Sequence, residues 1–220
     1  ALAPRLAQRF GAGCVTDATL IKPGENGVEF VRPAYGGTVL ERMTVSGPIQ
    51  FATVRSGSFA KPEAAEGSVE EKDAPVAADA LKAKVIDAAK EIAEAVDLEG
   101  AEVIVTGGRG MGNAENFKLV EELASLLGGV VGASRPAIEE GWASRAHQVG
   151  QSGKIVAPKL YIACGVSGAM QHVSGIMGSK YIVAINKDEA ASIFDIADVG
   201  IVGDVKEILP LLIEEIKARK

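Results

Sequence analysis

The amino-acid sequence predicts an α/β protein, with a doubly wound parallel sheet preceded by a partial, mostly β amino-terminal segment. The second half of the chain contains a series of short apolar runs, most of them followed by a helical pattern. Continuous apolar runs are typical of strands that are covered on both faces, as in a parallel sheet. Repetition of strand and then helix indicates the doubly wound class. Residues 1–60 instead alternate strand-like runs with Pro and Gly turns.

Composition narrows the class of protein. Apolar residues make up 47% of the 220 residues, which is enough for a hydrophobic core. A net charge of -6 without a dense basic run argues against nucleic acid as the main partner. Cys14 and Cys164 are far apart and show no metal-ligand spacing, so we expect neither a disulfide framework nor a metal site. No apolar run reaches the ~20 residues of a membrane helix, which predicts a soluble, non-secreted protein without a transmembrane segment.

The amino-terminal segment begins with an amphipathic pattern. Leu2, Leu6 and Phe10 share one face of a predicted short helix. Strands are then expected, separated by Pro and Gly turns, at residues 28–34, 38–45 and 50–55. The segment has few large apolar residues and would bury little surface alone. We therefore expect it to complete a sheet begun by upstream residues or by another chain.

A connector follows the amino-terminal segment. Residues 59–75 are rich in charged residues, Ala, Gly and Pro, which is typical of an exposed linker. The predicted division is a partial amino-terminal domain at 1–60, a linker at 61–76 and a second domain at 77–220. Apolar residues at helical spacing predict a helix at 79–97, with a strand and a turn before Asp97 as the alternative.

The second domain supplies the parallel sheet. Its strands are expected at residues 102–106, 130–133, 160–164, 181–185 and 199–202. The clearest helix spans 114–127, with Asn113 as its N-cap. The last helix spans 205–218 after Asp204, and Pro210 is expected to kink or divide it because proline lacks the N–H donor.

Residues that directly follow the predicted strands indicate a ligand site. In an open parallel sheet the ligand lies beyond the carboxyl ends of the strands. The turn at 165–168 leaves backbone N–H groups without partners beside a helix start, which favours a phosphate, and Gln171 and His172 lie in the first helical turn. The neighbouring candidates combine glycine turns, arginines, hydroxyls, an amide and a carboxylate, a set suited to a nucleotide-type cofactor. They are Gly107, Gly108, Arg109, Gly110, Ser134, Arg135, Asn186 and Asp204.

Each of these residues also has a structural interpretation. Asp204 is a good N-cap, Asn186 suits a loop, the two glycine motifs suit tight turns, and His172 suits a surface position. The GGRGMGN stretch lacks the spacing of the dinucleotide fingerprint, and residues 150–154 resemble a Walker loop only superficially. No arrangement of a nucleophile with a base is evident, and Cys164 lies in an apolar strand where a thiol is usually inert. The chemistry must therefore come from a cofactor.

Four stretches carry a family resemblance. GGRGMGNAENFKLVEELA, VGASRPAIEEGW, HQVGQSGKIVAPKLYIACGVSGAMQHVSGI and YIVAINKDEAASIFDIADVGIVGD resemble the carboxy-terminal, FAD-binding domain of the electron transfer flavoprotein alpha subunit. LAPRLAQRFGAG, VTDAT and FVRPAYGGTVLERMTV are similar to the second half of that subunit's amino-terminal domain. The first half of that domain has no counterpart, which implies that the chain is a fragment, a processed form or an incomplete sequence. The resemblance also favours a strand over the helix at 79–97.

The resemblance implies a role for each matched residue. Arg109 would approach the FAD phosphates, and Arg135, beside Ser134, would lie over or beside the flavin. Ser152 would hydrogen-bond near the flavin N5, and His172 would lie near the N1/O2 edge. Asn186 and Asp204 would reach the adenosine end. The remaining members of the implied cofactor-binding set are Val149, Gly150, Gln151, Ser167, Gly168, Ala169, Met170, Gln171 and Val205.

The resemblance further implies an electron carrier rather than a substrate-transforming enzyme. Such a carrier accepts electrons from flavin dehydrogenases, for example acyl-CoA dehydrogenases of fatty acid oxidation, and passes them to a quinone reductase or another acceptor. Arg135, Ser152 and His172 would tune the flavin toward an anionic semiquinone. A beta subunit would complete a heterodimer, in the cytoplasm of a prokaryote or the mitochondrial matrix of a eukaryote.

Three alternatives stay open. The first is an electron-bifurcating flavoprotein subunit that also uses NADH and ferredoxin. The second is a nucleotide-dependent catalytic domain, either like that of thiamine-diphosphate enzymes or NAD-dependent, for which only His172 and Asp204 qualify as acid or base. The third is a non-redox scaffold that binds an adenosine nucleotide.

Overall fold

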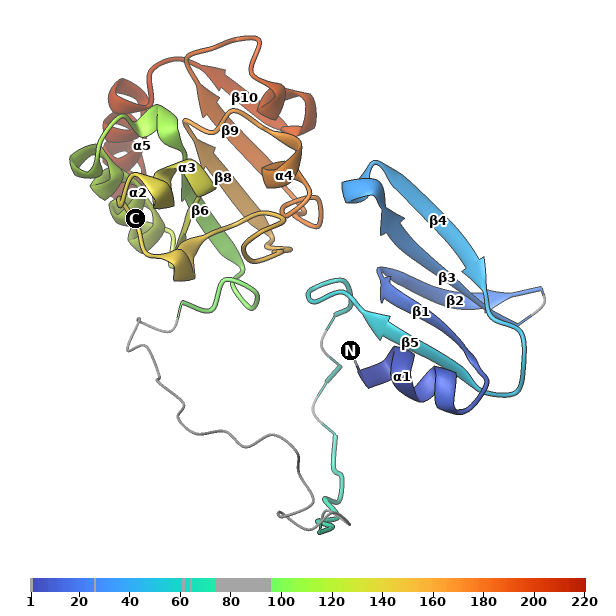
Figure 1. Ribbon diagram of the computed structural model, residues 1–220. Helices are drawn as coiled ribbons and strands as arrows, with labels where there is room; N and C mark the ends of the chain where they lie inside the picture. The colour runs from blue at the N-terminus through green and yellow to red at the C-terminus, as the bar shows by residue number, and fades with distance from the viewer. Residues whose placement is uncertain (1, 26, 61, 64, 74–95) are drawn as a thin grey trace.

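The computed structural model describes residues 2–25, 27–60, 62–63, 65–73 and 96–220 (Figure 1). Its carboxy-terminal part is a five-stranded sheet in which every neighbouring pair is parallel. The strands are β6 (Val103–Gly107), β7 (Val130–Ala133), β8 (Leu160–Cys164), β9 (Ile182–Asn186) and β10 (Val199–Val202). The predicted parallel α/β sheet is therefore confirmed, and each predicted strand lies within one residue of its observed bounds.

The order of the strands creates a crevice. The sheet runs β10-β9-β8-β6-β7, so the chain moves from β6 to the edge strand β7 and then returns past β6 to add β8. Gly107 at the end of β6 pairs with Ala133 of β7 and with Cys164 of β8, so the three strands end at the same level. The point at which the order reverses is where open parallel sheets bind their ligands.

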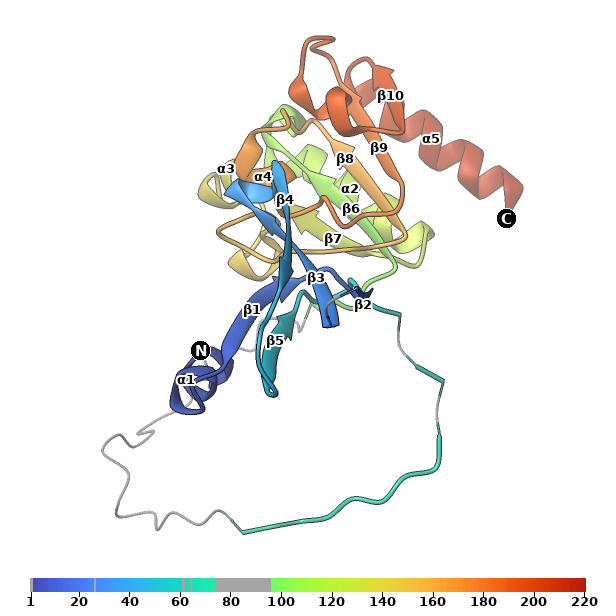
Figure 2. The same cartoon turned by 90° about the vertical axis from the view of Figure 1, so that its right-hand side faces the viewer.

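Two long helices cover one face of this sheet. They are α2 (Ala114–Leu126) and α5 (Val205–Arg219), and both views show them on the side opposite α4 (Met170–Val173) (Figure 1, Figure 2). Phe117, Val120 and Leu123 of α2 are buried, as the helical spacing predicts. Asn113 caps α2 by accepting a hydrogen bond from the Asn116 N–H at 2.8 Å.

Of the two outcomes expected at Pro210, a kink or a division, the division does not occur. Pro210 lies inside α5, which runs without a break. Leu209 and Ile213 flank it and are buried against the sheet, so packing holds the helix together despite the lost hydrogen bond.

The other face of the sheet is covered mostly by irregular chain. A second core there contains Tyr161 and Ile104 from the strands together with Val156, Ile176 and Ile193 from the connections. The helical elements on this side are short: α4 and the 3-10 helix η5 (Ser192–Ile196). Backbone that is not held in a long helix can bend toward the sheet edge, and these connections form part of the site described below.

The amino-terminal part contains two small sheets. After α1 (Leu2–Arg9), β1 (Gly13–Ala18) pairs in parallel with β5 (Gln50–Val54). The antiparallel sheet contains β2 (Leu20–Gly24), β3 (Gly27–Ala34) and β4 (Val39–Thr44), with the short 3-10 helix η1 (Tyr35–Gly37) between β3 and β4. Their buried cluster contains only Val15, Ala18 and Phe30, in line with the small core that the sequence indicates.

The strands β1 and β2 are absent from the sequence-based prediction. β2 contains Pro23, which argues against a strand interior. β1 contains Asp17, whose φ of 63° lies in the left-handed region. Arg55 holds Asp17 through two hydrogen bonds, from Nε at 3.1 Å and from Nη2 at 2.6 Å. The contact that stabilises this conformation comes from a residue 38 positions away, which local sequence patterns do not reveal.

The connector is exposed wherever the structure describes it, at residues 62–63 and 65–73. The helix expected at 79–97, like its alternative strand, falls almost wholly outside the described residues. No helix in the described part of the chain is both long and apolar enough to cross a membrane.

Candidate functional site

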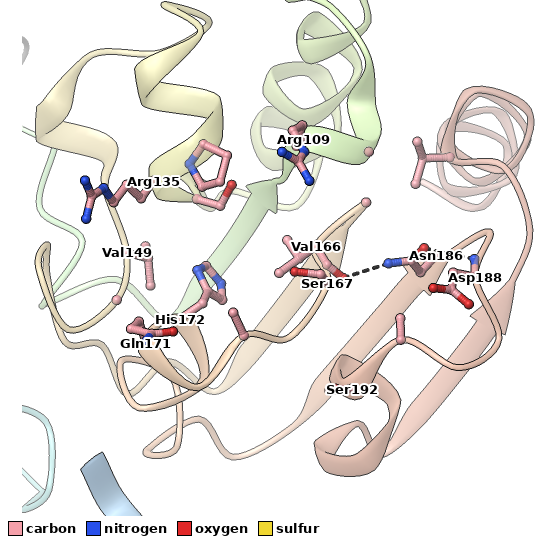
Figure 3. A pocket seen from close by; sticks show the side chains of 18 of the residues that line it. Arg109, Arg135, Val149, Val166, Ser167, Gln171, His172, Asn186, Asp188 and Ser192 are labelled. Atoms are coloured by element: carbon pink, nitrogen blue, oxygen red, sulfur yellow. Dashed lines mark hydrogen bonds between the residues drawn. The ribbon is translucent and has the colours of Figure 1, made fainter. Parts of the chain in front are cut away.

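A single cavity of about 850 Å³ lies at the carboxyl ends of the parallel strands (Figure 3). Small-molecule sites usually have volumes of ~300–1,000 Å³. Arg135, Val149 and Gln171 lie toward one end of the cavity, and Asn186 and Asp188 lie toward the other (Figure 3). The wall thus collects residues that follow all five strands, as the rule for parallel sheets predicts.

Fourteen of the sixteen predicted cofactor-binding residues line this cavity. Gly168 and Met170 are the exceptions, and each has a physical reason. Gly168 packs against the backbone of η5, since a Cβ there would lie 2.1 Å from the Ile193 nitrogen. Met170 directs its side chain outward and is 54% exposed. These two residues therefore do not line the cavity, and their contact with the cofactor stays a prediction.

Two glycine loops cross each other at the centre of the wall. The Gly108 N–H donates to the Cys164 carbonyl at 2.8 Å, and the Gly110 N–H donates to the Gly165 carbonyl at 2.9 Å. A Cβ on Gly108 would lie 2.3 Å from the Gly165 oxygen, and one on Gly110 would lie 2.7 Å from the Gly165 Cα. The two loops touch through their backbones, and side chains would push them apart.

The turn after β8 offers unpaired donors. In the part of the chain that the structure describes, the N–H groups of Val166, Ser167, Gly168 and Ala169 donate to no backbone acceptor. Such a run of free amides suits an anion, as the sequence predicts. α4, however, is only one turn long, so its dipole is small and the amides themselves must provide most of the attraction. Arg109 faces the same region from the end of β6 (Figure 3).

His172 is buried, so the interpretation as a surface histidine is wrong. It is 8% exposed, and its Nε2 lies 3.0 Å from the Tyr161 hydroxyl. Burial lowers the pKa of His172 to about 4, and the backbone of Val149 opposes this shift. Burial raises the pKa of Tyr161 far above its usual range. Both side chains are therefore neutral at pH 7.

The loop at 148–153 is fixed to its neighbours. Gln148 is 5% exposed and donates from Nε2 to the Ser152 hydroxyl at 2.8 Å. The Gln151 N–H donates to the Gln171 carbonyl at 2.7 Å. Gly150 and Gly175 touch through their backbones, since a Cβ on Gly175 would lie 2.5 Å from the Gly150 Cα. The loop and the segment after β8 thus form one continuous wall.

Arg135 lines the cavity but is paired with a neighbour at its rim. Its Nε lies 2.7 Å from Oε1 of Glu139, and the Arg135 side chain is 68% exposed. Ser134 is only 6% exposed, and its hydroxyl has no hydrogen-bond partner among the described residues. A buried hydroxyl without a partner costs about 1–3 kcal/mol, so a ligand atom that pairs with it would relieve that cost.

The far end of the cavity combines structural and ligand-facing roles. Asn186 donates from Nδ2 to the Val166 carbonyl at 2.8 Å and accepts from the Asp188 N–H at 3.0 Å, so it braces the turn after β8. Asp204 caps α5 by accepting from the Lys206 N–H at 2.9 Å. This hydrogen bond, with the nearby Lys206 and Lys187 charges, lowers the pKa of Asp204. Asp204 therefore stays ionised beside the cavity.

Sequence reasoning missed part of the wall. The omitted residues belong to the start of α3 (Arg135–Glu139) and to the connection after β9. They are Pro136, Lys187, Asp188, Ala190, Ala191 and Ser192. The polar run after β9 was a usable signal, because it follows a strand end in the same way as the predicted residues.

Cys164 agrees with the prediction of an inert thiol. It is fully buried in β8, and burial raises the pKa of its thiol to about 12.

The cavity suits an elongated dinucleotide such as FAD. Free amides and Arg109 match a pyrophosphate, and the unpaired Ser134 hydroxyl matches a polar ring edge. The glycine crossings provide close backbone approach that a Cβ would block. The fold and the site thus define a nucleotide-binding α/β protein.

The comparisons with known proteins specify the family. Residues 97–177 match the electron transfer flavoprotein FAD-binding domain, and residues 1–80 match the electron transfer flavoprotein domain. The chain belongs to the electron transfer flavoprotein alpha-subunit family, as the resemblance of its motifs indicated, and its cofactor is FAD.

Several curated relatives match over nearly the whole chain. The electron transfer flavoprotein subunit alpha of Thermoanaerobacterium thermosaccharolyticum is 46% identical, over 100% of this chain and 68% of the relative. Protein FixB of Clostridium saccharobutylicum is 48% identical, over 98% of this chain and 66% of the relative. The mitochondrial electron transfer flavoprotein subunit alpha of Dictyostelium discoideum is 44% identical, over 99% of this chain and 62% of the relative. The chain therefore spans about two thirds of the length of these relatives.

Proposed function

We propose that this chain is the FAD-carrying part of an electron carrier that takes electrons from flavin dehydrogenases, such as acyl-CoA dehydrogenases, and passes them to a quinone reductase or another acceptor. The observation that carries the proposal is the single cavity at the strand ends, lined by free amides and two arginines, in a member of this family. A beta subunit is the proposed partner, because the relatives are named alpha subunits.

Different residues of the chain would bind different parts of FAD. Amides of the turn after β8 and Arg109 would hold the pyrophosphate, and Asn186 and Asp204 would face the adenosine end. Val149, Gln151 and Ser152 would lie against the flavin ring. When bound, FAD supplies reversible one-electron chemistry, which none of these side chains can supply.

Charge at the flavin end is the proposed means of tuning. Arg135 at the cavity rim is a permanent cation, so it would favour negative charge on a nearby reduced ring. His172 is neutral at pH 7 and would act as a hydrogen-bonding group rather than as a charge. Ser152, held by Gln148, would present its hydroxyl at a fixed place.

The test of the proposal begins with the cofactor and the partner. The chain is co-expressed with a beta subunit of the family and purified, and the bound cofactor is identified by absorbance and mass. A yellow heterodimer that is reduced by an acyl-CoA dehydrogenase with its substrate supports the proposal. A colourless protein that binds only adenosine nucleotides favours the scaffold alternative, and reduction by NADH with ferredoxin as an acceptor favours bifurcation.

Arg135→Ala is expected to keep FAD bound but to lower the potential of the first one-electron reduction. Because the Arg135 side chain is largely exposed, we expect its removal to weaken the stabilisation of the reduced flavin by on the order of 1 kcal/mol. This corresponds to a decrease of roughly 50 mV in the potential of the first reduction. Potentiometric titration of the FAD-loaded protein measures this shift. Arg145→Ala is the matched control, because Arg145 is exposed and does not line the cavity. Equal potentials in both variants would show that Arg135 does not tune the flavin.

The domain division and the compartment are part of the same proposal. We propose one unit at 1–60, a linker at 61–76 and the FAD-binding unit at 77–220. The described connector residues, all exposed, support this boundary. The matched family regions, 1–80 and 97–177, agree with two separate units. The proposed location is the cytoplasm in a prokaryote or the mitochondrial matrix in a eukaryote.

A further inference from the structure

Tyr161 is a buried polar residue to which neither the family match nor the proposed function gives a role. It belongs to β8, is 0% exposed, and packs in the core on the face of the sheet opposite α2 and α5. A tyrosine ring in such a place needs a partner for its hydroxyl, because burying the group unpaired costs about 1–3 kcal/mol. That partner is the Nε2 atom of His172, 3.0 Å away.

We propose that Tyr161 is a positioning residue that holds the His172 ring in one orientation at the cavity, with its proton on Nδ1. The inference rests on the proposed function only in taking FAD as the ligand that His172 faces. The surroundings of the ring favour this polarity. Nδ1 is buried and has no hydrogen-bond partner of standard geometry among the described residues, while the backbone of Val149 raises the pKa of His172 as an accepting carbonyl does, so a proton on Nδ1 can use that neighbour.

The second polar neighbour of the Tyr161 hydroxyl, Thr106, supports the same direction of hydrogen bonding. Thr106 of the neighbouring strand β6 is fully buried next to Tyr161, and its own hydroxyl has no hydrogen-bond partner of standard geometry among the described residues. Thr106 can donate toward the Tyr161 oxygen, which leaves the Tyr161 proton free for the lone pair of Nε2. The three side chains then form a directed chain from Thr106 through Tyr161 to His172.

The hydrogen bond between Tyr161 and His172 matters for the site because the two ring nitrogens of a neutral histidine differ in hydrogen bonding. The nitrogen that carries the proton is a donor and the other is an acceptor, and the hydrogen bond made by one sets the state of the other. Tyr161 would therefore decide which kind of group His172 offers to the cavity, although Tyr161 itself does not line it.

The test is ¹⁵N NMR of the full chain with ¹⁵N-labelled histidine, with and without FAD. The chain contains two histidines, and a His147→Gln variant assigns the signals of His172. In the FAD-free wild type we expect one tautomer, with Nδ1 protonated. Tyr161→Phe removes only the hydroxyl, and the His172 signals should shift toward the average of the two tautomers.

Thr106→Val is the matched control, because it also removes one buried hydroxyl from the same chain of side chains. It should leave the His172 tautomer unchanged, since Tyr161 can still donate to Nε2. A wild-type proton on Nε2, or His172 signals that do not move in Tyr161→Phe, would overturn the proposal. Addition of FAD tests the proposed function separately from the role of Tyr161. If FAD leaves the His172 signals unchanged, the placement of FAD next to His172 is wrong. The comparison of the FAD-free proteins still decides the role of Tyr161.

Discussion

Gly165→Ala should lower the free energy of unfolding of the FAD-binding part by roughly 4 kcal/mol. Gly165 has a φ of 64°, a conformation that costs other residues about 1–2 kcal/mol. In addition, a Cβ there would lie 2.8 Å from the Gly110 Cα, and this neighbour is backbone that cannot rotate away. The remaining cost is that of forcing two tightly packed loops apart.

Two further glycines separate these contributions. Gly128→Ala tests the backbone conformation alone, because Gly128 has a φ of 65° and no atom within 4 Å of its added Cβ. We expect Gly128→Ala to lower the free energy of unfolding by about 1–2 kcal/mol. Gly108→Ala tests the contact alone: its N-cap geometry has a φ of −103°, which any residue adopts, but its Cβ would lie 2.3 Å from the Gly165 oxygen. We expect Gly108→Ala to lower the free energy of unfolding by about 2–3 kcal/mol.

Urea unfolding followed by fluorescence of the single tryptophan, Trp142, measures all three variants, because Trp142 packs against the core of this part. FAD affinity should fall in Gly165→Ala and Gly108→Ala but not in Gly128→Ala, which lies away from the cavity. Equal losses for Gly165→Ala and Gly128→Ala would show that the loop crossing yields easily, and the explanation through backbone contact would be wrong.

The FAD-free protein should lose stability as the pH falls from about 6.5 to about 4, and His172 should account for roughly 3 kcal/mol of the loss. The folded-state pKa of His172 is lowered to about 4, whereas an unfolded histidine has a pKa of about 6.5. Between these values the unfolded chain binds a proton that the folded chain excludes, so stability rises with pH. The contribution is complete above pH ~6.5 and does not fall further below pH ~4.

His172→Gln isolates this contribution from the carboxyl groups that titrate in the same range. Gln is neutral at every pH and can accept the Tyr161 hydrogen bond, so the difference in stability between wild type and variant should follow the histidine alone. Urea unfolding at pH values from 4 to 7.5 gives that difference. A difference that is constant over this range would mean that His172 takes up its proton in the folded state, which contradicts its burial.

The sequence was most informative where one physical rule decides the structure. The apolar runs of β6, β8 and β9 contribute buried residues on both faces of the sheet, so their pattern alone locates them, whereas the edge strand β10 is apolar but largely exposed. Asp17 and Pro23 show the opposite case: the strand that contains Asp17 is held by pairing with the distant β5, and the strand that contains Pro23 forms a hairpin with β3 despite the proline. Pro210 illustrates a third case: the local rule predicts a kink or a division, and the helix stays undivided because Leu209 and Ile213 are buried.

The site could be predicted as a set of positions but not as a set of contacts. Strand ends meet at one edge of a parallel sheet, which is why Arg109, Ser134 and Asn186 were identified from their spacing. Nothing in the sequence indicates that Asn186 braces the turn after β8 or that Arg135 pairs with Glu139. Such contacts depend on side-chain geometry after folding, and the burial of His172 by Tyr161 belongs to the same group.

The cavity wall draws on residues from Arg109 to Val205, so it is complete only after the last strand and the start of α5 have joined the sheet. A partly folded chain that lacks this edge offers FAD only part of its binding surface. FAD should therefore act as a folding ligand, adding about 2.7 kcal/mol to the native state at a free concentration one hundred times its dissociation constant. Limited flavin supply in a cell would then reduce the amount of this protein by leaving newly made chains exposed to proteolysis for longer.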